Sequence, residues 1–238
     1  MKKIIVIILV CLGGFSAEAQ TLETFFTQAD SFFKTYVKNG RVAYSEIKKE
    51  PSTLNEVLKT AEGISVSKTD AKNYQAFWIN AYNLSVIKGL VDNYPTSSPL
   101  NDKGFFDKTK YNLAGKKLTL NSIENDLLRA QFKDARFHFV LVCGAVGCPP
   151  LINKAYLPST LEAQLQKQAT LAINGDYFIK VNNKKKQVKG SKILEWYKED
   201  FVVNGQTEIE YLNRFRTTKI PTDFKLSYFE YNWNINKP

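Results

Sequence analysis

The sequence predicts an α+β fold: a single domain in which several helices pack around a small, mostly antiparallel sheet. Three observations predict it. Long stretches repeat apolar residues at the period of a helix, short stretches alternate like strands, and no long linker divides the chain. With 238 residues, 44% hydrophobic and 24% charged, the chain can bury a sizeable core, and wholesale disorder is excluded. We expect one domain over residues 20–238.

Residues 1–19 have the three parts of a secretory signal peptide. A basic head at residues 1–3 precedes an apolar run at residues 4–12, and small residues at 17–19 offer a cleavage site. The apolar run is too short to span a bilayer comfortably, so we expect no transmembrane segment after signal removal. We predict an exported protein, periplasmic or secreted. A lipoprotein anchored through Cys11 is disfavoured, because a bulky valine precedes that cysteine.

The first half of the mature chain predicts mostly helices. Helical spacing of aromatic and other apolar residues predicts helices over 21–39, 51–62 and 70–93, the first ending at a glycine and the last before Tyr-Pro. A short extended piece is expected over 41–47. Alternation around Ala-Gly predicts a hairpin over 111–120, and Asn121 or Ser122 is expected to cap a helix that runs to about Gln131.

The second half mixes strands and helices. The compact apolar run 137–142 predicts a buried strand, followed by a Gly- and Pro-rich loop over 143–150. We expect a helix over 158–173, a hairpin joining 177–181 to 187–189, short helices over 193–201 and 208–215, and a last strand over 224–233.

Several blocks along the mature chain resemble one family, Domain of Unknown Function 547. The blocks are residues 77–83, 122–124, 138–144 with 147–150, 191–201 and 231–233. The resemblance implies a shared fold in an exported bacterial protein, and for its Cys/His blocks a thiol-protease-like or acyl-transfer role. The chain departs from the family's usual pattern at Asn125, where histidine is common, and at Asn232, where aspartate is common. It therefore carries a single histidine.

The leading hypothesis is thiol-dependent amide or acyl chemistry, as a hydrolase or transferase. Cys143 or Cys148 would be the nucleophile, and His138 the base. Glu124 would orient the base and Asn80 would donate to a developing oxyanion. One expectation opposes this: a straight strand would separate His138 from Cys143 by about 16 Å and turn their side chains to opposite faces.

The alternative is a non-catalytic binding module of the cell envelope. It predicts a Cys143–Cys148 disulfide or two inert thiols, and a binding groove with Trp78, Tyr82 and Asn83. Two asparagines within an aromatic-rich helix are unusual, and buried amides need partners. Asn80 and Asn83 could therefore instead hold the backbone of the loop after Cys143.

Charge and composition limit the partners. The formal net charge is +10, but export makes nucleic acid an improbable partner. The run Lys184, Lys185 and Lys186 predicts at most a weak polyanion contact, and the expected ligand is a small molecule, a peptide or an envelope polymer. No cofactor or metal is predicted: no phosphate-binding glycine motif occurs, and three cysteines and one histidine exclude a Cys₄ zinc site.

Overall fold

The computed structural model describes residues 8–238, and the side chains of residues 21–238. The predicted signal peptide falls partly on residues 1–7, outside the described chain, and otherwise on residues whose side chains are not described. Signal peptide, export and a single domain over 20–238 therefore stay predictions. Within residues 8–238, no helix is both long enough and apolar enough to cross a membrane.

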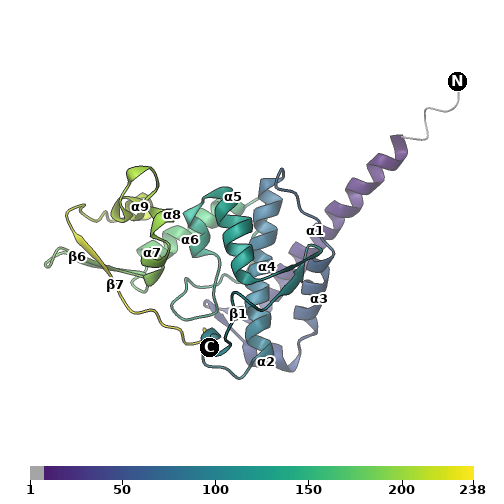
Figure 1. Ribbon diagram of the computed structural model, residues 1–238, viewed down its shortest axis with the longest axis horizontal. Coiled ribbons are helices and arrows are strands. Elements are labelled where there is room, and N and C mark those ends of the chain that lie inside the picture. Colours follow the sequence, from purple (N-terminus) through teal and green to yellow (C-terminus); the bar gives the residue numbers. More distant parts are fainter. Residues whose placement is uncertain (1–7) are drawn as a thin grey trace.

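The fold is α+β, as predicted, and helix α4 (Ala71–Asp92) lies at the centre of its larger hydrophobic core (Figure 1). The Asp70 side chain caps this helix by accepting a hydrogen bond from the backbone N–H of Asn73. Its side chains are buried along nearly the whole length. Around it pack α1 (Ile8–Tyr36), α2 (Tyr44–Lys49), α3 (Ser52–Glu62) and the π-helix η2 (Ser122–Arg129).

The strands form small separate sheets rather than one central sheet. Two are hairpins: β1 (Val37–Lys38) with β2 (Arg41–Val42), and β3 (Tyr111–Leu113) with β4 (Lys116–Leu118). In the third, β6 (Gln187–Gly190) pairs antiparallel with β5 (Ile179–Asn182) and parallel with β7 (Lys225–Tyr228). The pairing is thus mostly antiparallel, as predicted.

A second hydrophobic core lies against this last sheet, on the side of Figure 1 away from α3. It is built by α6 (Leu161–Asn174), α7 (Lys192–Trp196), α8 (Lys198–Phe201) and α9 (Glu208–Phe215). Three further short helical elements are η1 (Pro99–Asn101), α5 (Ala130–Phe132) and η4 (Val203–Gly205). Tyr231 packs against both cores.

The predicted strand over 137–142 is wrong. Residues Ala135–Phe139 form the 3₁₀ helix η3, which a turn follows. The Asp134 side chain accepts the backbone N–H of Arg136, and the Asp134 carbonyl accepts that of Phe137, so the chain coils from its first residues. A short apolar run is compatible with a buried helix or a buried strand, and here this capping favours the helix. The separation of about 16 Å expected along a strand therefore does not apply.

Other boundaries also shift. The extended piece over 41–47 is only β2, because α2 begins at Tyr44, and the last strand ends at Tyr228. Asn121 makes no side-chain cap; instead Thr119 Oγ1 accepts the N–H of Ser122 at 3.1 Å.

The two asparagines of α4 each hold a piece of irregular backbone. Asn83 Nδ2 donates to the Val140 carbonyl and its Oδ1 accepts from the Val142 N–H, both at 2.9 Å. Asn80 Nδ2 donates to the Tyr156 carbonyl at 2.8 Å, and its Oδ1 accepts from the Tyr156 N–H at 3.0 Å. They therefore fix the chain just before Cys143 and beyond the loop, rather than the loop itself.

We predict that Asn83→Ala lowers the free energy of unfolding by about 2–4 kcal/mol, because a buried N–H and a buried carbonyl both lose their partner. Urea unfolding followed by circular dichroism measures the change. Asn55→Ala, on the exposed face of α3, is the matched control and should change stability by less than about 0.5 kcal/mol. Equal effects of the two substitutions would contradict the role assigned to Asn83.

Candidate functional site

A cavity of about 340 Å³ lies where α4, η2, η3 and α7 meet the C-terminal segment. Nearly half of the residues that line it are aromatic, and its polar and sulfur-bearing groups come from distant parts of the chain. The aromatic residues are Tyr82, Phe106, Trp196, Tyr197, Tyr231 and Trp233; the others include Asn121, Glu124, His138, Cys143 and Cys148.

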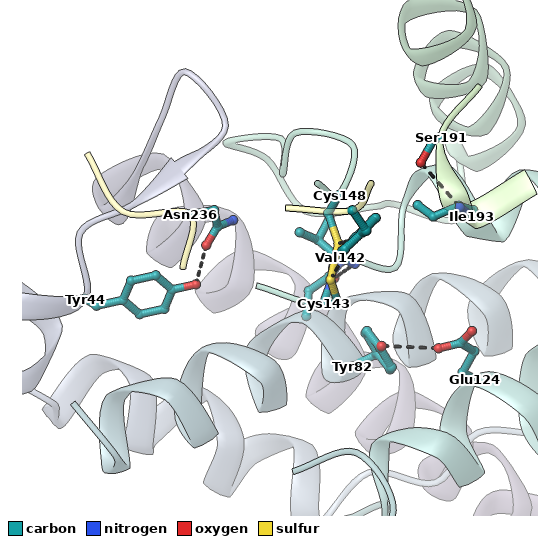
Figure 2. The surroundings of a disulfide bond; sticks show 11 residues. Tyr44, Tyr82, Glu124, Val142, Cys143, Cys148, Ser191, Ile193 and Asn236 are labelled. Atoms are coloured by element: carbon teal, nitrogen blue, oxygen red, sulfur yellow. Dashed lines mark hydrogen bonds between the residues drawn. A yellow bond between two sulfur atoms is a disulfide. The ribbon is translucent and has the colours of Figure 1, made fainter. Parts of the chain in front are cut away.

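Cys143 and Cys148 form a disulfide in the wall of this cavity, next to α4 (Figure 2). Their Cα atoms are 6.4 Å apart. The loop between them is held by the C-terminal segment: the N–H groups of residues 146 and 147 donate to the carbonyls of residues 234 and 232 at 2.8 and 2.9 Å. Gly144 has a φ of +82°, a conformation that favours glycine, and a Cβ there would collide with Leu90 of α4.

His138 is 4% exposed and pairs with a residue that the sequence reasoning missed. Its Nε2 lies 2.6 Å from Oδ2 of Asp200 in α8, and its ring packs at a tilt against Tyr197, with 4.1 Å between the centroids. Because an ionised carboxylate only accepts, Nε2 carries the proton and a neutral ring has its lone pair on Nδ1. Within residues 21–238, no protein atom hydrogen-bonds Nδ1.

Asp200 holds its negative charge through two donors. Arg129 Nε donates to the same Oδ2 at 2.7 Å, and the Arg129 guanidinium lies over the Tyr197 ring at 4.7 Å. Burial alone would raise the pKa of Asp200, but the hydrogen bonds from His138 and Arg129 lower it from 3.8 to about 2. The carboxylate is therefore ionised at neutral pH and can orient the imidazole.

Glu124 does not orient His138, as the sequence reasoning expected. It is 8% exposed, and its Oε2 accepts a hydrogen bond from the Tyr82 hydroxyl at 3.2 Å (Figure 2). Burial, reinforced by the nearby Glu124 carboxylate, raises the pKa of Tyr82 and that of Tyr197. Both hydroxyls stay protonated at neutral pH, so they can donate toward the carboxylate.

The C-terminal segment adds an aromatic wall. Trp233 stacks on Trp196 at 5.7 Å with an angle of 28° between the planes, and Tyr231 packs against both indoles. The Tyr231 hydroxyl lies 3.1 Å from Cys143 Sγ and 3.0 Å from Cys148 Sγ. Trp196 is 43% exposed, so one indole of this wall is open to solvent.

Five of the predicted site residues line the cavity, and three do not. Cys143, Cys148, His138, Glu124 and Tyr82 are brought together, whereas Asn80, Asn83 and Trp78 lie elsewhere in the core. Both amide hydrogens of Asn80 bond backbone carbonyls, so none is left for an oxyanion. Trp78 packs on Tyr74 and Phe77, away from the cavity.

The missed residues had a signal in the sequence, since blocks 191–201 and 231–233 both resemble the family. The resemblance of these blocks did not indicate which of their side chains contact one another in the fold.

The basic run Lys184, Lys185 and Lys186 lies in the exposed turn between β5 and β6 and does not line the cavity. Lys186 pairs with Asp223 at 2.9 Å. Weak polyanion contact through this turn stays a prediction. Among the described residues, no group of three or more His, Cys, Asp or Glu side chains could hold a metal ion.

Residues 66–171 match the profile of the family described as Protein of unknown function, DUF547. The match begins before α4 and ends inside α6, so it includes Glu124, His138 and both cysteines. Asp200, Trp196 and Tyr231 lie beyond it. No curated protein and no solved structure matches the chain.

The pKa of Asp200 makes a pH-dependent contribution to stability that can be measured. Because the pKa is lower in the folded state than in an unfolded chain, the carboxylate stabilises the fold above about pH 4, and this contribution is lost as the pH falls toward 2. We predict that Asp200→Asn lowers the free energy of unfolding by roughly 2 kcal/mol at pH 7, a difference that shrinks toward zero near pH 2.

Urea unfolding at a series of pH values measures this difference. Asp126→Asn, at an exposed carboxylate of η2, is the control and should stay within about 0.5 kcal/mol of the parent. A difference for Asp200→Asn that does not change with pH would count against the two hydrogen bonds.

Proposed function

Through residues 66–171 the chain belongs to DUF547, a family of proteins of unknown function, and we propose that this member is a binding module of the cell envelope. Its cavity would take one sugar ring of an envelope polymer or of a free oligosaccharide. The observation that carries the proposal is that a half-exposed Trp196 indole and a buried Glu124 carboxylate line the same cavity.

The chemistry of the wall suits such a ligand. A sugar ring presents C–H groups on its flat face, which pack on an aromatic ring, and hydroxyls at its edge, which need hydrogen-bond partners. Trp196 and Trp233 offer the aromatic surface, while Glu124 and Asn121 offer acceptors and a donor. The cavity volume of about 340 Å³ falls at the small end of the range for ligand pockets, about 300–1,000 Å³.

The disulfide favours binding over catalysis in the oxidised protein. Sulfurs that are bonded to each other cannot attack a carbonyl, so Cys143 and Cys148 serve as a rigid, apolar part of the wall. An apolar and aromatic lining with a few polar groups is the usual composition of a small-molecule site.

We predict that Trp196→Ala raises the Kd for a bound oligosaccharide about tenfold, because an exposed aromatic anchor is lost. Indole fluorescence of the oxidised protein is followed during titration with cellotetraose and with the tetrasaccharide of N-acetylglucosamine, and calorimetry supplies the Kd of the variant. Tyr177→Ala, an equally exposed ring outside the cavity, is the matched control and should bind as the parent does. Absence of saturable binding of either sugar would end this proposal.

A second function is favoured by one specific observation: His138, oriented by Asp200, lines the same cavity as both sulfurs. We propose that reduction of the disulfide releases a thiol for amide or acyl chemistry. The thiol proton would pass to Nδ1 of His138 while the sulfur attacks the acyl carbon. The imidazolium would then protonate the leaving amine or alkoxide, and water would hydrolyse the thioester. In this scheme Asp200, and not Glu124, orients the base.

We predict that the reduced protein releases p-nitrophenol from p-nitrophenyl acetate, and that His138→Gln slows this release at least ~100-fold because no base remains. A Cys11→Ser background leaves only the cavity thiols. Oxidised protein and the double variant Cys143→Ser/Cys148→Ser should both be inactive, and Asp200→Asn should be slower than the parent. Equal rates for the reduced parent and His138→Gln would exclude this second function.

A further inference from the structure

The two cysteines of the disulfide differ in their exposure to solvent. Cys143 is partly exposed and Cys148 is 6% exposed, although both line the cavity. A thiolate that enters the cavity therefore reaches the sulfur of Cys143 more easily than that of Cys148. Thiol–disulfide exchange depends on which sulfur is attacked and on how well the other sulfur leaves.

Cys148 Sγ also has one hydrogen-bond donor more than Cys143 Sγ, because the Tyr231 hydroxyl lies within 3.1 Å of both sulfurs and a backbone N–H bonds Cys148 Sγ. The backbone N–H of Cys143 donates to it at 2.9 Å, and the Tyr231 hydroxyl lies 3.0 Å away. Neither sulfur of a disulfide carries a hydrogen, so the hydroxyl is the donor. Burial raises the pKa of Tyr231, so this donor keeps its proton at neutral pH. Donors of this kind stabilise a thiolate far more than a neutral sulfur.

The donors are held in place independently of the S–S bond. The Tyr231 ring packs against both Trp196 and Trp233, and a Cβ on Gly147 would come within 2.8 Å of it. Asn83 fixes Val142 directly before Cys143, and residues 146 and 147 bond to the C-terminal segment. Breaking the disulfide would therefore leave both donors directed at Cys148.

We propose that the Cys143–Cys148 disulfide is redox-active and oxidises dithiols that reach the cavity. One thiolate of the dithiol attacks Cys143 Sγ; the S–S bond breaks, and its electron pair remains on Cys148 as a thiolate. The second thiolate of the substrate attacks its own sulfur in the mixed disulfide and displaces Cys143. The substrate leaves as a disulfide, the protein has gained two electrons, and two protons end on the pair of cysteines or in solvent. This activity depends on neither function proposed above.

The central test is the redox equilibrium of the Cys11→Ser protein in buffers of reduced and oxidised dithiothreitol. Iodoacetamide traps the thiols, and intact mass gives the reduced fraction. Tyr231→Phe keeps the ring and removes one donor to Cys148, so the equilibrium constant for reduction should fall about tenfold, or ~30 mV for two electrons. Tyr228→Phe removes a hydroxyl that bonds Glu208 instead, and it should leave the equilibrium unchanged.

Thiolate absorbance near 240 nm tests the leaving group directly, even if Tyr231→Phe were poorly folded. The lone thiol of Cys143→Ser should have a lower pKa than the lone thiol of Cys148→Ser, since only Cys148 has the backbone donor. The Cys148→Ser variant keeps the more exposed cysteine, Cys143. It should therefore form a mixed disulfide with glutathione disulfide faster than Cys143→Ser does. The proposal is overturned if the order of the two pKa values is reversed. It is also overturned if dithiothreitol reduces the disulfide only after urea has unfolded the parent protein. Sugar binding by the oxidised protein would be unaffected by either result.

Discussion

The amide of Asn83, which forms two hydrogen bonds from the middle of a buried helix, is the interaction on which the site most depends. Residues 140–142 belong to neither a helix nor a sheet, so their buried N–H and carbonyl groups need partners from elsewhere. One side chain of α4 supplies both, to Val140 and Val142. Leaving such groups unpaired would cost free energy, so residues 140–142 are held in one position. Because Cys143 follows directly, its place in the cavity wall depends on that position.

The C-terminal segment adds a constraint from the far end of the chain. It passes along the loop between the cysteines, forms the bridge between Ala145 and Ile235, and places Tyr231 against both cores. The site therefore needs both cores to be formed before it is complete. Its sulfurs belong to the part of the chain that matches DUF547, whereas Asp200 and the rings of Trp196, Tyr231 and Trp233 lie beyond that match.

A feature of the fold could be predicted where the residues that determine it are neighbours in the sequence. The helix of residues 70–93 was predicted almost to the residue because its apolar period lies within it, and its Asp70 cap and the following Tyr-Pro lie directly at its ends. The run 137–142 was assigned wrongly because a fully apolar run has no period, and the hydrogen bonds of Asp134 decided its conformation. His138, Glu124 and the two cysteines were identified as site residues, but Asp200 and its pairing with His138 were not. His138 bonds Asp200, 62 residues further along the chain, and no local pattern encodes that contact.

The oxidation state of the two cysteines changes what the same cavity can do, and the change is electrostatic. With the disulfide intact, Glu124 is the acidic residue among those that line the cavity, and the Asp200 carboxylate behind His138 is paired with Arg129. Reduction with loss of one proton adds a second uncompensated negative charge near Glu124, in a buried site where like charges interact more strongly than in water. The reduced cavity must therefore favour a proton or a cationic group more than the oxidised one does. That proton has an acceptor on Nδ1 of His138, the one ring nitrogen that the fold leaves without a partner among residues 21–238.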